Sequence, residues 1–191
     1  MIPRLVVASK NPDKITEIED VLEPLGLTQE IVRGLDWPDV EETGQTLEDN
    51  ALLKARTVSI SVGLPALADD TGLEVAALDG RPGVNTARFA GTKASYADNV
   101  SLLLQQLQGV TDRRALFRTV VALVFPDGVE VVAAGTVEGV ITMERRGEHG
   151  FGYDPVFEVD GRTLAEMSLA DKSQLSHRAR ALRALAATLR E

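Results

Sequence analysis

Two long apolar segments joined by a short turn place the strongest constraint on how this chain folds. Residues 115–126 (ALFRTVVALVFP) and 129–142 (VEVVAAGTVEGVIT) are rich in β-branched residues, which favour strands. The sequence PDG at residues 126–128 is typical of a turn, so the two segments are predicted to form a hairpin. Because hairpin strands are antiparallel, the sheet that contains them cannot be purely parallel.

The rest of the chain alternates apolar runs with helical periodicity. Strands are expected at residues 4–8, 29–35 and 66–70, within 71–83, and at 156–161. Helices are expected from Pro12 to Pro24–Gly26 and at residues 47–61, 95–108 and 172–190. Mixing βα units with a hairpin predicts an α/β fold with a mixed sheet. No linker or repeat interrupts residues 1–191, so we expect a single domain, and this length also suffices for two lobes sharing a core.

Charge and composition exclude several classes of function. The net charge of −9 disfavours binding to a nucleic acid polymer, although it permits a small anionic ligand that meets local cations or a metal. No apolar stretch approaches the roughly 18 residues of a membrane span, and the N-terminal apolar run is too short for a signal peptide. The absence of cysteine fits a reducing cytoplasm, where we expect the protein to reside.

Several common nucleotide and metal motifs are missing. The sequence has no GxxxxGK[ST] loop, no GxGxxG after a strand and no GxSxG. Two histidines without cysteine cannot build a typical zinc site. Any metal would therefore be held by carboxylates, which suits Mg²⁺, or Mn²⁺ in its place.

The segment SKNPDK at residues 9–14 begins the first predicted helix. Asn11 suits the capping position and Pro12 the first helical position. Lys14 then stands in the first turn, where the helix dipole disfavours a cation. A phosphate chain bound at this helix terminus would explain the lysine, with Ser9 and Asn11 adding hydrogen bonds. The alternative is a surface lysine beside a simple asparagine cap.

Two acidic pairs are candidates for catalysis and metal binding. Asp69 and Asp70 end an apolar strand, and since neighbouring strand residues point to opposite sides, one can face a cleft while the other faces structure. The alternative is a turn at Asp-Thr-Gly. Glu41 and Glu42 lie in an acidic loop that is either simply solvated or joins the aspartates in an oxygen site for Mg²⁺.

Two further stretches suggest contacts to a base. In HGFGYDP (149–155) the glycines allow close backbone approach, and Phe151 and Tyr153 either stack on a base or pack in the core. In KSQLSHR (172–178), Lys172, His177 and Arg178 lie off or at the edge of the leucine stripe of the last predicted helix. These potential cations either bind an anion or the edge of a base, or form a solvated face of the helix.

Taken together, these stretches make the sequence resemble the inosine triphosphate pyrophosphatase family. The motifs occur in family order and cover nearly the whole chain: SKNPDK (9–14), EETGQTLEDNALLKA (41–55), LADDTGLEV (67–75), PGVNTARFAG (82–91), GFGYDPVF (150–157) and LAEMSLADKSQLSHRARAL (164–182). The resemblance implies an elongated α/β fold in which two lobes flank a nucleotide cleft. It also implies a homodimer that hydrolyses ITP, dITP and XTP to the monophosphate and pyrophosphate with Mg²⁺.

The resemblance also implies roles for individual residues. Asp70 would be the proton acceptor and a metal ligand, with Glu41 or Glu42 assisting at the metal. The remaining contacts would go to the substrate: Ser9, Asn11 and Lys14 to the triphosphate, Thr71 to the substrate, Phe151, Gly152, Tyr153 and Asp154 to the base, and Lys172, His177 and Arg178 to the rest of the pocket and the purine edge.

Two other functions are compatible with much of this pattern. A nucleotide sensor that binds without hydrolysis needs the same phosphate cradle but not the acids, so the presence of both acidic pairs favours an enzyme. A pyrophosphatase for modified pyrimidine triphosphates is the nearest alternative among enzymes. The expected partner is a small purine nucleoside triphosphate, with neither a nucleic acid polymer nor a membrane involved.

Overall fold

The computed structural model describes residues 1–190 and shows a mixed α/β fold. Its strands are β1 (Ile2–Val7), β2 (Thr28–Val32), β3 (Ala66–Val75), β4 (Pro82–Gly83), β5 (Arg114–Val124), β6 (Glu130–Ile141), β7 (Phe157–Val159) and β8 (Arg162–Thr163). Its α-helices are α1 (Pro12–Leu25), α2 (Leu47–Val62), α3 (Tyr96–Gln106), α4 (Leu169–Leu175) and α5 (His177–Thr188).

The strands are hydrogen-bonded in the order β2-β1-β3-β5-β6-β7-β8, with β4 pairing β3. Strand β1 is parallel to β2 and β3, whereas β7 is antiparallel to β6 and β8. The expected hairpin is present, because β5 and β6 are neighbours and a tight turn joins Phe125 to Val129. The predicted mixed sheet is therefore confirmed.

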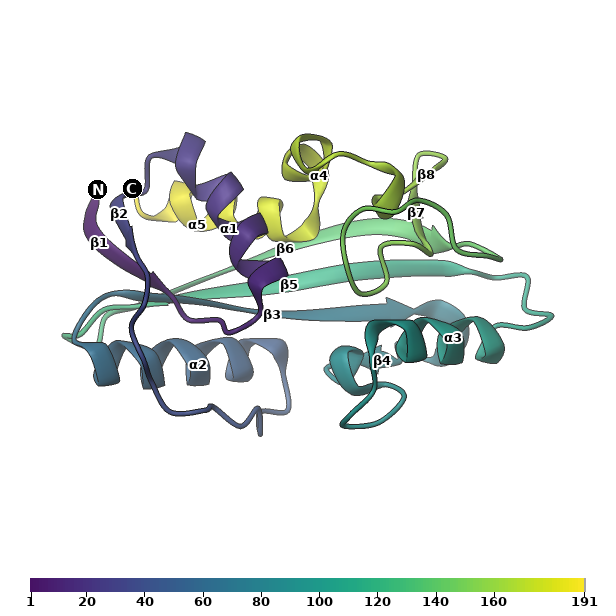
Figure 1. The fold of residues 1–191 in the computed structure, drawn as a ribbon, viewed down its shortest axis with the longest axis horizontal. Helices are drawn as coiled ribbons and strands as arrows, with labels where there is room; N and C mark the ends of the chain where they lie inside the picture. Colours follow the sequence, from purple (N-terminus) through teal and green to yellow (C-terminus); the bar gives the residue numbers. More distant parts are fainter. Residues whose placement is uncertain (191) are drawn as a thin grey trace. The chain divides into compact units, whose positions relative to one another are not determined.

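The described chain divides into two compact units. Unit 1 comprises Met1–Asp70, Thr119–Gly135 and Ser176–Glu191, and unit 2 comprises Thr71–Arg118 and Thr136–Leu175. Within unit 1, α1 and α5 pack together on one face of the strands and α2 covers the other face (Figure 1). The core on the α1/α5 side joins apolar residues of β1, α1, β3, β5 and α5. Because α2 lies on the opposite face, side chains that alternate along β3 meet different helices.

Unit 2 has its own core. Buried residues of α3, among them Leu103, pack with residues of β3, β5 and β6 and with the segment that includes Tyr153 and Phe157. The rings of Phe117 and Phe157 lie 4.5 Å apart, centroid to centroid, a separation typical of paired aromatic side chains. Tyr153 makes the glycine-rich loop part of this core.

Two boundaries differ from the sequence prediction. Residues 66–75 form one strand, whereas a strand ending at Asp70 and a second one after it were expected. The predicted helix 172–190 is two helices, since α4 ends at Leu175 and α5 begins at His177. The hydroxyl of Ser176 accepts a hydrogen bond from the Ala179 amide and caps α5, which explains the break.

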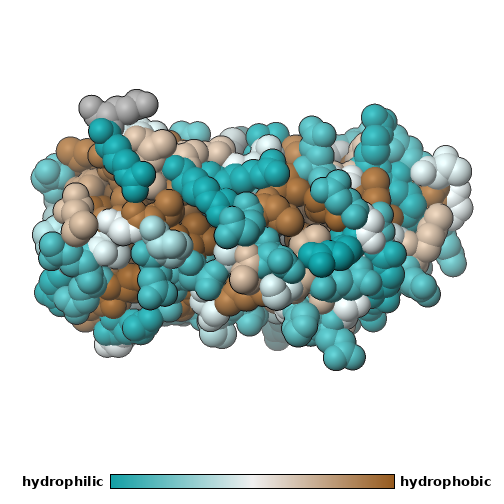
Figure 2. All heavy atoms as spheres, turned by 90° about the horizontal axis from the view of Figure 1, so that it is seen from above, coloured by the Kyte–Doolittle hydropathy of each residue, from teal (hydrophilic) through white to brown (hydrophobic). Residues whose placement is uncertain are grey.

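The surface carries little continuous apolar area on the face that Figure 2 shows, where hydrophilic side chains separate the apolar ones. Across residues 1–190, no helix combines the length and the apolar character that crossing a membrane requires.

Candidate functional site

The start of α1 has the predicted local structure. The side chain of Asn11 accepts hydrogen bonds from the amides of Asp13 (2.9 Å) and Lys14 (3.4 Å), and Pro12 occupies the first helical position. The hydroxyl of Ser9 accepts a hydrogen bond from the Asn11 amide at 3.2 Å. Ser9, Asn11 and Lys14 are therefore neighbours, all half-buried, at the end of a helix where N–H groups and the dipole attract anions.

Lys14 has a specific partner that explains its place in the first turn. Its ammonium lies 3.4 Å from a carboxylate oxygen of Asp69, which comes from β3 and is 2% exposed. An opposite charge at this distance offsets the unfavourable interaction of the lysine with the helix dipole. The cation is thus held at the helix N-terminus by a contact between α1 and β3.

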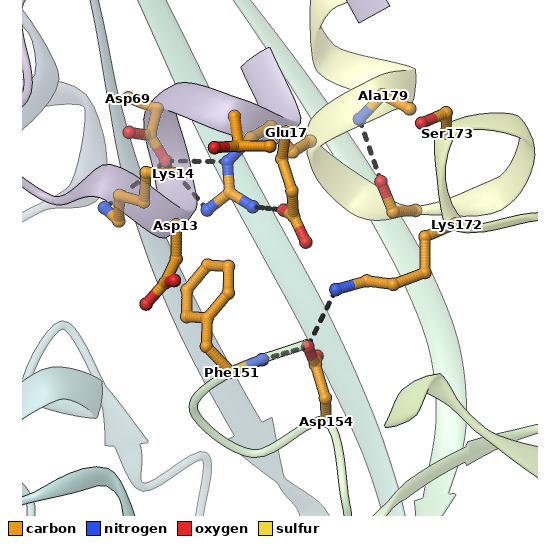
Figure 3. Close-up of polar contacts among 12 residues, drawn as sticks. Asp13, Lys14, Glu17, Asp69, Phe151, Asp154, Lys172, Ser173 and Ala179 are labelled. Atoms are coloured by element: carbon orange, nitrogen blue, oxygen red, sulfur yellow. Dashed lines mark hydrogen bonds and ion pairs between the residues drawn. The ribbon is translucent and has the colours of Figure 1, made fainter. Parts of the chain in front are cut away.

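Asp69 is the centre of a buried ion network. The guanidinium of Arg178 donates to it from Nε (3.2 Å) and Nη2 (3.1 Å), and Nη1 donates to Glu17 (Figure 3). Burial alone would raise the pKa of Asp69, but the charges of Lys14 and Arg178 outweigh it and hold that pKa well below its usual range. Asp69 is therefore an ionised structural carboxylate that joins α1, β3 and α5.

Asp70 faces a different set of side chains. It accepts a hydrogen bond from the amide nitrogen of Asn50 at 3.1 Å, and the ammonium of Lys54 lies 3.6 Å from it, both partners coming from α2. Burial raises the pKa of Asp70, and repulsion from Glu42 adds to the rise while Lys54 opposes it. A carboxylate whose pKa is shifted toward neutrality suits a general base.

Two residues of the acidic loop, Glu42 and Gly44, contact the same side chains that contact Asp70, namely Lys54 and Asn50. The ammonium of Lys54 lies 2.6 Å from Glu42, and the side-chain oxygen of Asn50 accepts from the Gly44 amide at 2.8 Å. A β-carbon on Gly44 would approach this oxygen to 2.6 Å, so the contact requires glycine there. Glu42 is half-buried, whereas Glu41 is exposed.

The predicted metal ligands form a pair rather than a trio. Within residues 1–190, no group of three or more acidic or histidine side chains is placed to hold a metal ion. Asp70 and Glu42 nevertheless share one ammonium and repel each other electrostatically. Carboxylate oxygens are ligands that Mg²⁺ prefers, so the chemistry of this pair is compatible with the predicted ion, while in the structure the Lys54 ammonium contacts both groups.

The remaining predicted residues lie mainly in unit 2. In its glycine-rich loop, Asp154 accepts hydrogen bonds from the Phe151 amide (2.8 Å) and from the ammonium of Lys172 (2.7 Å), and Figure 3 shows both groups directed at it. Lys172 and Asp154 are both buried, so neither of these charges is solvated. A β-carbon on Gly150 would collide with the Asp154 carboxylate, which explains that glycine.

The two aromatic residues of this loop have different environments. Tyr153 is 4% exposed, belongs to the unit 2 core, and donates its hydroxyl hydrogen to the Thr86 carbonyl at 3.0 Å. Burial raises its pKa. Tyr153 therefore follows the core alternative rather than base stacking. Phe151 and Gly152 are half-buried, and the Lys172 ammonium lies 5.4 Å from the centre of the Phe151 ring.

Three further predicted contacts come from β3 and from the start of α5. Thr71 is half-buried in β3, directly after Asp70. His177 and Arg178 open α5 in unit 1 and are both buried. The guanidinium of Arg178 is engaged by carboxylates through all three of its nitrogens, so reading a purine edge would require it to leave at least one of them.

Sequence reasoning missed three residues of these networks: Glu17, Asn50 and Lys54. Asn50 and Lys54 are four residues apart on α2, which places them on one face of the helix. That spacing within EDNALLKA was a usable signal, because an asparagine and a lysine on a helical face that packs against strands need polar partners. Glu17 follows Lys14 by three residues on α1, so the same argument applies to it.

Comparisons with known proteins show similarity over nearly the whole chain. A family model described as the Ham1 family matches residues 5–188. A "dITP/XTP pyrophosphatase" from an Exiguobacterium species is 46% identical, with 97% of this chain and 96% of the relative covered. The solved structure of a HAM1 protein from Coxiella burnetii matches with a TM-score of 0.85 and 39% identity, covering 99% of each chain. A dITP/XTP pyrophosphatase structure from Mycobacterium abscessus matches with a TM-score of 0.73 and 43% identity, covering 97% of this chain and 99% of that one.

Proposed function

The chain belongs to the Ham1 family, and on that basis we propose that it hydrolyses the non-standard purine nucleoside triphosphates ITP, dITP and XTP to the monophosphate and pyrophosphate. The observation that carries the proposal is the environment of Asp70. This carboxylate has a raised pKa and lies beside Glu42, Asn50 and Lys54. Relatives of nearly full-length similarity bear the corresponding name, which supports the choice of substrate.

The reaction needs a water, a base and a site for the leaving group. Asp70 accepts a proton from the water as its oxygen attacks the α-phosphorus. The bond from the α-phosphorus to the bridging oxygen breaks, and pyrophosphate leaves with the electron pair. Lys14 and the N-terminus of α1 stabilise the negative charge on the phosphates. Held by oxygens of Asp70 and Glu42, Mg²⁺ would supply further positive charge against the phosphate oxygens.

A substrate panel tests this function. Pyrophosphate release from ITP and XTP is expected to exceed release from ATP by at least about a hundredfold in kcat/KM, because a site built for a 6-oxo group leaves polar atoms unpaired against the adenine amine. The panel includes GTP, dUTP and methylated dTTP, each with and without Mg²⁺. Preference for the pyrimidine substrates would establish the alternative enzyme. Tight binding of ITP without pyrophosphate release would establish a sensor.

The pH dependence of the reaction tests the role of Asp70. Because its pKa is raised above the usual aspartate value of 3.8, the acid limb of kcat/KM is expected to lie above that pH, with activity rising as Asp70 loses its proton. Lys54 lowers this pKa, so Lys54→Met is expected to move the limb to still higher pH. Lys93→Gln, at an exposed position, is the control. A limb that stays in place or moves to lower pH in Lys54→Met would contradict the assignment.

We also propose the homodimer and the cytoplasmic location as properties that accompany this activity. A nucleotide-pool enzyme acts where free nucleotides are made, and the cysteine-free sequence suits a reducing compartment. Sedimentation equilibrium measures the dimer, and fractionation of the source cells measures the location.

A further inference from the structure

An aromatic residue outside the matched motifs lies against the loop assigned to the base. Tyr96 is the first residue of α3, and its ring centre is 5.8 Å from that of Phe151, with 41° between the ring planes. This tilted geometry lies within the range that aromatic pairs prefer. Tyr96 is 42% exposed, so its ring is not needed to fill the unit 2 core.

The position of Tyr96 is set by two independent contacts on α3. Ser95 caps the helix in a capping box with Asp98, which holds the first turn that carries Tyr96. The guanidinium of Arg145 donates to the Ala97 carbonyl and to the Ser101 hydroxyl, both at 2.8 Å, and ties this turn to the segment that leads into the glycine-rich loop. These contacts hold the first turn of α3, and with it the backbone of Tyr96, beside that loop.

Phe151 is held from several directions at once. Its amide is bound by Asp154, its ring interacts with the Lys172 ammonium, and Tyr96 contacts the ring as well. The first two contacts share one buried ion pair, since Lys172 also binds Asp154. The contact with Tyr96 does not involve this ion pair.

We propose that Tyr96 is a positioning residue for the nucleobase, acting through Phe151. The inference rests on the proposed function, and it adds a residue that the motif comparison does not assign. Tyr96 restricts the Phe151 ring to the tilt seen here, so that the half-buried ring offers a ready stacking surface to a planar purine. Its effect is expected at the nucleoside end of the substrate, because the ring that Tyr96 contacts is that of Phe151.

The test compares Tyr96→Leu and Tyr96→Gln with Tyr96→Phe. In the first two variants, the KM for ITP and the inhibition constant of inosine are expected to rise together by about three- to tenfold, with kcat within about twofold of the wild type. Inhibition by inorganic tripolyphosphate, a probe of the phosphate end alone, is expected to stay unchanged. Tyr96→Phe keeps the ring and is expected to behave as the wild type does. Met143→Ala, at another exposed apolar position of unit 2, is the matched control.

The outcomes separate this inference from the proposed function. The positioning role alone is overturned by the following result: the wild type releases pyrophosphate from ITP, and Tyr96→Leu has the same KM for ITP and the same inhibition constant for inosine. Equal weakening of inosine and tripolyphosphate inhibition also overturns it, because that result indicates general damage to the fold. A wild type that does not hydrolyse ITP overturns the proposed function, and the role of Tyr96 falls with it.

Discussion

Replacing Asp70 by asparagine is expected to lower the turnover of ITP by about a thousandfold while ITP binding stays within a few-fold of the wild type. Asparagine keeps the size and the polarity of the side chain but cannot accept the proton of the attacking water. The phosphate contacts proposed for Ser9, Asn11 and Lys14 do not depend on Asp70, so binding should survive. Pyrophosphate release gives the turnover, and calorimetry with ITP gives the affinity.

The same variant should be at least as stable as the wild type. Because the pKa of Asp70 is raised in the folded state, its ionised form is penalised there, and this penalty grows as the pH rises through the range above 3.8. A neutral asparagine removes the penalty at pH 7. Asp36→Asn, which removes an exposed carboxylate of unit 1, is the matched control for both measurements. Retention of more than about a tenth of the wild-type turnover in Asp70→Asn would remove Asp70 from the role of base.

Replacing Arg178 by glutamine is expected to cost about 3–5 kcal/mol in the free energy of unfolding at pH 7. The substitution leaves Asp69 and Glu17 buried without the guanidinium that binds both. Urea unfolding measures the loss. Arg180→Gln, at an exposed position of the same helix, should change the stability by no more than about 0.5 kcal/mol.

At acidic pH, the difference in the free energy of unfolding between Arg178→Gln and the wild type should become smaller. In the wild type the pKa of Asp69 is lowered, so its stabilising contribution is present above the usual aspartate value and is lost as the pH falls through the folded-state pKa. Without Arg178, Lys14 and Lys54 still oppose the effect of burial, but the pKa of Asp69 rises, so acid relieves part of the cost of burying this carboxylate. The difference in the free energy of unfolding should thus be smaller at pH 4 than at pH 7. In addition, the triple variant Arg178→Met, Asp69→Asn, Glu17→Gln should recover much of the stability that Arg178→Gln loses. A difference that is independent of pH would assign the effect of Arg178 to packing.

Local signals in the sequence predicted most of the secondary structure. Asn11 and Pro12 begin α1, and Thr46 forms a capping box with Asp49 at α2, because capping depends on residues a few positions apart. The hairpin strands were placed within two residues of their observed ends. The break before α5 was missed because the leucine spacing continues across Ser176, although a serine is a recognised capping residue.

The sequence did not predict which charged residues form ion pairs with one another. Asp69 binds Arg178 across 109 positions of the chain. The sequence Asp70-Thr71-Gly72, for which a turn was the alternative, lies in the middle of β3. The strand continues because its carboxylates find cations on α1, α2 and α5, and such long-range partners leave no periodicity to detect. The alternation rule did predict that the two aspartates would separate, but not which one would be structural.

The alternation along β3 also limits how the length of this chain can vary. Removing or adding one residue between Ala66 and Asp69 would slip the strand by one position and turn each aspartate to the other face. After an insertion, Asp69 would lie beside Lys54 and Ala68 would face Arg178, which would then have no carboxylate from β3. After a deletion, Asp70 would face Arg178 and Thr71 would lie beside Lys54, which would then lose the proposed base. The surface loops of such a chain can vary in length, whereas the number of residues between Ala66 and Asp69 in β3 must stay the same.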